Sequence, residues 1–215
     1  AAQFPAMVDN PMGVLPYFLV FALITMWLVS RGVNKGIETA ARLLMPLFFI
    51  LLVGLALYSI ISGLASGGTA QAVAFMFTPD FSKIDMSVIL LAVGQALLTL
   101  SVGGAGMLVY GAYIGGNVSI PKSSFIIAGM DTVVALMAGL MIFPIVFQYG
   151  LVPDQGPGLM FVTLPVAFGQ MPGGDYFAIM FFTLLLLAAL STGLSMFEPV
   201  VAWLKDQRGV SRAVG

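Results

Sequence analysis

The sequence predicts an all-α integral membrane protein with about five membrane-spanning helices. Hydrophobic residues make up 60% of the 215 positions and charged residues only 8%, with a mean hydropathy of +1.08. Charged residues would account for about 25% of a soluble domain. The hydrophobic residues fall into five runs long enough to cross a bilayer, which takes about 20 apolar residues in a helix. Because a helix satisfies its own backbone hydrogen bonds within lipid, these runs are expected to be helical.

The spans are expected to form a single transmembrane region over residues 1–215, at 14–30, 40–62, 87–114, 123–147 and 176–203. Seven of the eight Lys and Arg residues fall in three segments between or after spans: Arg31, Lys35 and Arg42; Lys122; and Lys205, Arg208 and Arg212. Basic residues collect in cytoplasmic loops, so the chain is expected to start outside the cell and finish in the cytoplasm. Since it begins with Ala1 and shows no signal peptide, we expect it to be a fragment of a longer polytopic protein.

Composition also narrows the chemistry. The chain has no Cys and no His, which removes thiol chemistry, disulfides and the usual zinc and haem ligands. Its net charge of -1 gives no support for nucleic acid as a partner. An intramembrane aspartyl protease needs two facing aspartates, but only Asp131 lies deep in a span, and no His or Lys base lies at depth for a serine protease. We therefore expect a protein that is not an enzyme and has no cofactor.

The third span gathers polar and small residues near the middle of the membrane. These residues are Gln95, Thr99, Ser101, Gly103, Gly104 and Gly106. Glycine costs about 1 kcal/mol relative to alanine inside a helix, and unpaired backbone groups in lipid cost several more unless they line a cavity. Two interpretations are equally open from the glycines alone. One is a helix broken at mid-depth, as in secondary transporters; the other is close helix packing through small residues.

Three further features of the spans are candidates for function. Asp131 lies about two turns into the fourth span, where a carboxylate costs a few kcal/mol unless it is solvated, paired or bound to a cation. A monovalent cation is its expected partner, because hard oxygen ligands suit such ions; a protonated or helix-capping Asp131 is the alternative. Ser191 and Thr192 in the fifth span can bond to the preceding turn or face a ligand. Pro46, ten residues after Gly36, removes one backbone hydrogen bond and permits local unwinding.

With these features in this order, the chain resembles the bacterial branch of the neurotransmitter:sodium symporters. The resemblance covers essentially all 215 residues and is carried by the segments Arg31-Gly32-Val33-Asn34-Lys35-Gly36-Ile37-Glu38, Phe77-Thr78-Pro79-Asp80-Phe81, Gly94-Gln95 to Ser101, Gly158-Leu159-Met160-Phe161-Val162-Thr163-Leu164-Pro165, Ser191-Thr192 and Glu198-Pro199. It implies that the spans are the fourth to eighth of about a dozen, in part of a leucine-transporter-type bundle built from inverted repeats. It also implies a discontinuous helix near 99–106.

The function implied by the resemblance is sodium-coupled symport of an amino acid by alternating access. The implied location is the bacterial cytoplasmic (inner) membrane, with sodium as the coupling ion. The implied partners are the amino-acid substrate, the lipid bilayer and the remaining helices of the same transporter. The chain alone is expected not to transport.

The resemblance assigns roles to individual residues. The first sodium site would be formed by Thr99 and Asp131, and the second by Ala188 (through its carbonyl), Ser191 and Thr192. The substrate-pocket positions are Leu98, Ser101, Gly104 and Met196. Gln95 and Ala135, with Thr99 and Asp131, correspond to the surroundings of the chloride site in animal members. Gly36 and Pro46 correspond to the family's unwinding motif, which opens a water path to the second sodium.

Departures from the family pattern sharpen these expectations. Leu98 replaces an aromatic residue that usually caps the substrate, so the gate is expected to differ from the family's. Gly104 replaces a larger pocket residue and leaves room for a bigger substrate, so we expect a bulky hydrophobic or aromatic amino acid. Asp131 replaces an amide, and Ala135 replaces a hydroxyl that helps to bind chloride in animal relatives. A fixed carboxylate would supply the negative charge that chloride otherwise brings, so transport is expected to be chloride-independent. From composition alone, a channel with broken helices along its pore or a structural membrane subunit stays open as an alternative.

Overall fold

The computed structural model describes residues 3–32, 36–102, 106–112, 114–115, 118–153 and 156–208, and every regular element among them is helical. In chain order these elements are α1 (Gln3–Val8), α2 (Pro11–Ser30), α3 (Glu38–Ser66), α4 (Gly68–Phe77), η2 (Phe81–Lys83), α5 (Met86–Thr99), α6 (Gly106–Ala112), α7 (Ile120–Gln148), η3 (Leu159–Thr163), α8 (Leu164–Phe168) and α9 (Gly174–Arg208). In this described part, α2, α3, α7 and α9 are long and apolar enough to cross a membrane. The predicted all-helical fold is confirmed.

The predicted third span is present as two helices. α5 ends at Thr99 and α6 begins at Gly106, so the discontinuity predicted near 99–106 is confirmed. The other four predicted spans differ from the helices by a few residues at their ends; for example, α3 continues to Ser66 and α7 begins at Ile120.

Capping residues explain where two of the helices begin and end. Asp85 precedes α5, and its carboxylate accepts the backbone N–H of Val88 at 2.8 Å, which is the usual N-cap hydrogen bond. Hydrogen bonds from the Ser87 hydroxyl and the Val88 N–H hold the pKa of Asp85 below its ordinary value. α3 ends at Gly67, whose φ of 77° lies in the left-handed region that favours glycine at a helix C-terminus.

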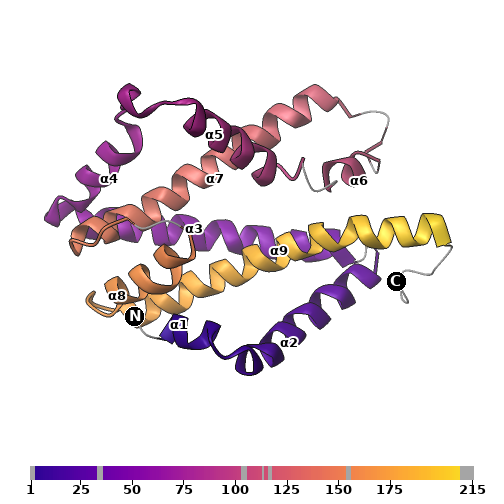
Figure 1. The fold of residues 1–215 in the computed structure, drawn as a ribbon, viewed down its shortest axis with the longest axis horizontal. Coiled ribbons are helices and arrows are strands. Elements are labelled where there is room, and N and C mark those ends of the chain that lie inside the picture. The colour runs from indigo at the N-terminus through magenta and orange to yellow at the C-terminus, as the bar shows by residue number, and fades with distance from the viewer. Residues whose placement is uncertain are drawn as a thin grey trace.

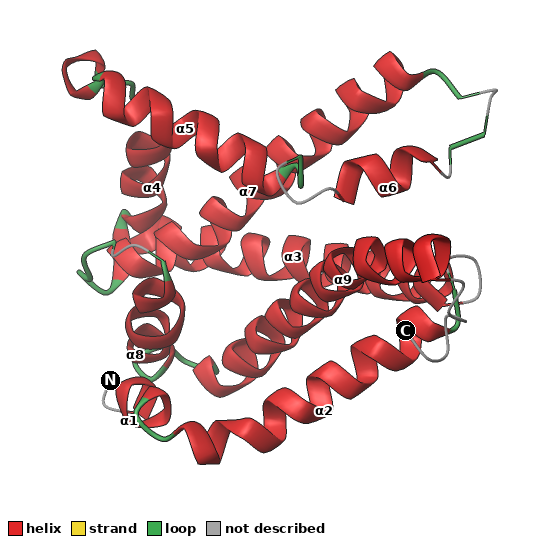
Figure 2. Ribbon diagram, turned by 45° about the vertical axis from the view of Figure 1, so that its right-hand side comes forward, coloured by secondary structure: helices red, strands yellow, loops and turns green. Residues whose placement is uncertain are grey.

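The helices form two groups on either side of a central pair. In Figure 1, α3 and α9 run side by side across the molecule, with α2 below them and α4, α5, α6 and α7 above them. Figure 2 shows α5 and α6 above α3 and α9 and α2 below them, while α7 slants down to contact α3. The last turns of α2 and α9 and the first turns of α3 and α7 lie at the right-hand end of Figure 1. The helix ends that carry or border Arg31, Arg42, Lys122 and Arg208 therefore share one end of the bundle, which is compatible with the predicted orientation; the orientation in the membrane stays a prediction.

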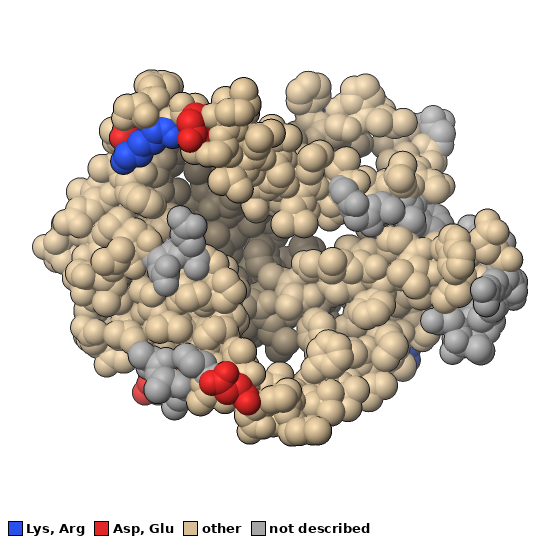
Figure 3. Space-filling model, viewed as in Figure 1, with Lys and Arg blue, Asp and Glu red and all other residues tan. Residues whose placement is uncertain are grey.

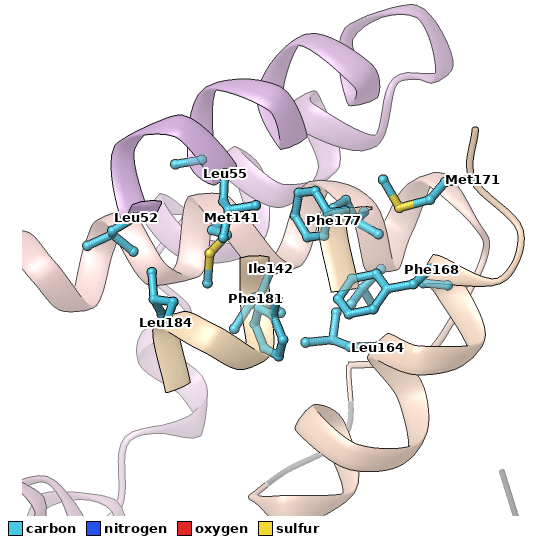
Figure 4. Close-up of a cluster of buried hydrophobic side chains, with 14 residues drawn as sticks. Leu52, Leu55, Met141, Ile142, Leu164, Phe168, Met171, Phe177, Phe181 and Leu184 are labelled. Carbon is cyan, nitrogen blue, oxygen red and sulfur yellow. The ribbon is translucent and has the colours of Figure 1, made fainter. Parts of the chain in front are cut away.

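The main hydrophobic core lies at the opposite end, where α3, α7, α8 and α9 meet (Figure 4). Its centre is Phe181, which is 1% exposed and packs on Phe168 with ring centroids 5.4 Å apart. Phe177 also packs on Phe168, with ring centroids 5.1 Å apart. The side chains of Leu52 and Leu55 from α3 and of Met141 and Ile142 from α7 close this core. It fixes α9 against α3 and α7, and it thereby positions the polar turn of α9 described next.

Candidate functional site

The break between α5 and α6 begins with a left-handed turn at Ser101. The Ser101 φ is 54°, and Ser101 is the one non-glycine residue with positive φ in the described part of the chain. Its N–H donates to the carbonyl of Leu98 at 3.0 Å, and the Val102 N–H donates to the carbonyl of Leu97 at 3.0 Å. These two bonds form the Schellman arrangement, which usually has glycine at the left-handed position. The sequence correctly predicted a break here, but Ser101 makes the turn; Gly103 and Gly104 lie outside the described residues.

A cavity of about 680 Å³ joins this break to the polar turn of α9. From the break it is lined by Gly94, Leu97, Leu98, Thr99, Ser101 and Gly106, and from α9 by Ser191, Thr192, Ser195 and Met196. The surface of the molecule is hollowed between the upper and lower helix groups (Figure 3). Three of the predicted substrate positions, Leu98, Ser101 and Met196, therefore line one cavity. The fourth, Gly104, lies outside the described residues.

The predicted first ion site brings together α5 and α7. The Thr99 hydroxyl donates a hydrogen bond of 3.1 Å to Oδ1 of Asp131, 32 positions later in the chain. Asp131 is half-buried and does not line the cavity, whereas Thr99 does. One carboxylate and one hydroxyl are oxygen ligands of the kind that a small hard cation prefers. Among the described residues no group of three or more acidic, His or Cys side chains could hold a metal ion.

The predicted second ion site lies on a single turn of α9. The Ser191 hydroxyl donates to the carbonyl of Ala188 at 3.3 Å, and the Ser195 hydroxyl donates to the carbonyl of Ser191 at 3.2 Å. Thr192 is exposed toward the cavity. The Ala188 carbonyl and the Ser191 hydroxyl, both proposed ligands, are thus already within hydrogen-bond distance of each other.

The remaining predicted residues lie apart from the cavity. Gln95 is exposed on α5 one turn before Thr99, and Ala135 is exposed on α7 one turn after Asp131; neither lines the cavity. Gly36 lies just before α3, where a Cβ atom would collide with the carbonyl oxygen of Leu28. The helix α3 is continuous around Pro46.

The sequence alone did not single out three residues of this site. Gly94 and Leu97 line the cavity from α5, and Tyr110 of α6 donates a hydrogen bond of 3.3 Å to the Ser195 hydroxyl. The helical spacing offered a signal for Gly94, which is four residues before Leu98, and so on the same face of α5. The signal for Tyr110 was a phenol group inside an otherwise apolar helix, since a buried tyrosine hydroxyl usually finds a hydrogen-bond partner.

Comparison with known proteins identifies relatives along nearly the whole chain. Residues 7–213 match the model of the sodium:neurotransmitter symporter family. The uncharacterized sodium-dependent transporter YhdH of Bacillus subtilis is 40% identical over 201 residues, which is 94% of this chain and 44% of that protein. An uncharacterized sodium-dependent transporter of Haemophilus influenzae is 32% identical over 95% of this chain and 44% of its own length. The chain thus spans about half the length of the curated relatives it matches.

A solved structure shares both the fold and the sequence pattern. The crystal structure of MhsT in complex with L-phenylalanine superimposes with a TM-score of 0.84 and 42% identity, over 98% of this chain and 47% of that one. The match confirms the predicted bundle with a discontinuous helix.

Proposed function

The chain belongs to the sodium:neurotransmitter symporter family, and from that premise we propose that the whole protein is a sodium-coupled amino-acid symporter. The observation that carries the proposal is the cavity at the helix break. Leu98 of α5 and Ser101 of the break line this cavity together with Ser191 and Thr192 of α9. Thr99, which donates to Asp131, lines it as well. In a secondary transporter, substrate and coupling ions bind at such broken helices near the midplane of the membrane.

The proposed roles follow the contacts. Thr99 and Asp131 bind the first sodium, and the carbonyl of Ala188 with the hydroxyls of Ser191 and Thr192 binds the second. Thr99 serves both regions, because it donates to Asp131 and also faces the cavity. A sodium ion between Thr99 and Asp131 would thus order the end of α5 from which the substrate positions project. This contact is a physical route by which ion binding favours substrate binding.

The proposed substrate is a bulky hydrophobic or aromatic amino acid. Leu98 and Met196 give the cavity apolar walls from two different helices, and both side chains are more than 70% exposed toward open space. The similar structure of MhsT was solved in complex with L-phenylalanine, which supports a substrate of this size. The experiment is a binding screen of the twenty amino acids on the full-length protein, with and without sodium. A preference for small or charged amino acids would overturn the substrate class, and binding independent of sodium would overturn the coupling.

We also propose that transport does not need chloride. Asp131 supplies a fixed negative charge at the first ion site, and Ala135, one turn later on α7, has no hydroxyl to offer an anion. Uptake by the full-length protein should be equal when gluconate replaces chloride. A marked loss of uptake in gluconate would contradict this part of the proposal.

The proposed role of Gly36 and Pro46 is in release toward the cytoplasm. Pro46 leaves one carbonyl of the preceding turn of α3 without its helical donor, although the helix is continuous in this structure. Gly36 permits a close approach to the backbone of Leu28, at the C-terminal end of α2. Separation of these two helix ends would let the first turns of α3 unwind and admit water.

A further inference from the structure

The short helix α6 is tied to α9 by a side-chain hydrogen bond. The Tyr110 hydroxyl donates to Oγ of Ser195 at 3.3 Å, and both residues are half-buried. Among the side-chain hydrogen bonds between described residues, this is the one that joins α6 to another helix. The helix α6 follows the break directly, so this bond fixes the second half of the discontinuous helix against the scaffold of α9.

The bond from Tyr110 continues along α9 as a directed chain. The Ser195 hydroxyl donates its single proton to the carbonyl of Ser191 at 3.2 Å. Ser195 therefore meets Tyr110 as an acceptor, which makes Tyr110 the donor. The Ser191 hydroxyl in turn donates to the carbonyl of Ala188 at 3.3 Å. The first two bonds thus run from α6 to the backbone carbonyl of Ser191. The third joins the Ser191 hydroxyl to the Ala188 carbonyl on the same turn, and these are two of the groups to which the proposed function assigns the second sodium.

We propose that Tyr110 is a positioning residue for the second sodium site, acting through Ser195. The inference rests on the sodium-symport function proposed above. A serine that bonds to the carbonyl four residues earlier draws that carbonyl outward and bends the helix slightly. Donation from Tyr110 polarises the Ser195 hydroxyl and strengthens its bond to the Ser191 carbonyl, since hydrogen bonds in a chain reinforce one another. Tyr110 thus holds the turn of α9 in the shape in which Ala188 and Ser191 face one cation.

The arrangement also couples the ion to the broken helix. If sodium binds better when the turn of α9 is held by Tyr110, then sodium binding must equally favour the position of α6 in which Tyr110 reaches Ser195. Occupation of the second ion site would therefore fix α6, and loss of that sodium would release it.

The test measures sodium binding without any assumption about the substrate. The melting temperature of the full-length protein is followed while sodium chloride replaces N-methylglucamine chloride at constant ionic strength, and the sodium concentration for half the maximal shift is read from the curve. Tyr110→Phe removes the hydroxyl and keeps the ring. We expect it to raise the half-saturating sodium concentration about fivefold, the effect of one neutral hydrogen bond, with little change in the melting temperature without sodium. Tyr17→Phe, on an exposed face of α2, is the matched control and should match the wild type.

A double-mutant cycle shows whether Tyr110 acts through Ser195. Ser195→Ala should shift the sodium curve at least as far as Tyr110→Phe, and Ser195→Thr, which keeps the hydroxyl, should restore it to within about twofold of the wild type. In the Ser195→Ala background, Tyr110→Phe should have no further effect. Multiplicative effects of the two changes would overturn the inference, as would an unchanged sodium curve for Tyr110→Phe. A large loss of melting temperature without sodium would point to a merely structural role and would overturn it as well.

Failure of this inference can be told apart from failure of the proposed function. Thr192→Ala removes a proposed ligand directly. If Thr192→Ala raises the half-saturating sodium concentration and Tyr110→Phe does not, the second sodium site is supported and the positioning role of Tyr110 is refuted. If sodium raises the melting temperature of the wild type no more than N-methylglucamine does, both the proposed function and this inference are refuted.

Discussion

The charge of Asp131 gives the sharpest test of the first ion site. Asp131→Asn removes the negative charge but keeps an oxygen that can accept the 3.1 Å hydrogen bond from the Thr99 hydroxyl. The change therefore separates the attraction between the carboxylate and a cation from the local geometry. A hydrophobic replacement would disturb both at once.

The magnitude follows from the position of the carboxylate. A cation that touches both Thr99 Oγ1 and Asp131 Oδ1 would lie within about 4 Å of the charge, where attraction between unit charges is about 4 kcal/mol near a protein surface and about 1 kcal/mol in bulk water. Asp131 is half-buried, so the loss should fall between these limits. Since about 1.4 kcal/mol is a factor of ten in affinity, the lower limit of about 1 kcal/mol corresponds to about fivefold. We therefore expect at least a fivefold rise in the half-saturating sodium concentration.

The sodium-dependent melting assay described above measures this shift directly. Asp85→Asn is the matched control: Asp85 is exposed at the start of α5, and asparagine caps a helix about as well as aspartate. Asp85→Asn should leave the sodium curve unchanged. The reasoning is refuted if Asp131→Asn also leaves the curve unchanged, because a carboxylate at the ion cannot be removed without a cost in ion affinity.

Two further predictions concern backbone positions. Gly68→Ala should lower the melting temperature, because the new Cβ would lie 2.6 Å from the carbonyl oxygen of Pro144 and overpacking of this kind costs about 1–3 kcal/mol. Gly54→Ala is the control. A Cβ at Gly54 would have no atom within 4 Å, so this change should be neutral or stabilising. Ser101→Gly should raise the melting temperature, because it relieves about 1–2 kcal/mol of strain in the left-handed backbone conformation, and it should weaken substrate binding. Ser101→Ala should also weaken substrate binding, but it should not raise the melting temperature. Equal stabilities of the Gly and Ala variants at 101 would contradict the strain argument.

Much of the fold could be predicted from the sequence because the membrane leaves few alternatives. Hydrophobic runs of sufficient length must be helical in lipid, so α2, α3, α7 and α9 were predicted with errors of only a few residues at their ends. The short helices between the spans, such as α4 and α8, were not predicted. They depend on tertiary contacts. The ten residues of α4 and the five residues of α8 are too few for a periodic pattern that would predict a helix from sequence.

The site was predicted in part, and the limit is geometric. The polarity of Asp131 inside a span marked it as a candidate functional residue without any structure, and its role stays a prediction. The pairing of Asp131 with Thr99 needed the crossing of α5 and α7, which the local sequence does not contain. The bond from Tyr110 to Ser195 spans 85 positions and also depends on tertiary structure. Spacing along one helix could show only that Ser195 shares a face with Ser191.

The turn at Ser101 joins the structural and functional arguments. Glycine is the usual residue at the left-handed position of such a turn, and this chain has glycines only a few residues later, yet serine stands there at φ 54°. A side chain in that conformation costs about 1–2 kcal/mol that glycine would not. The serine hydroxyl lies on the wall of the cavity, where strained residues commonly serve binding. The proposed substrate role of Ser101 would account for a side chain at a position where glycine costs less. It predicts that loss of the hydroxyl weakens binding even when the fold becomes more stable.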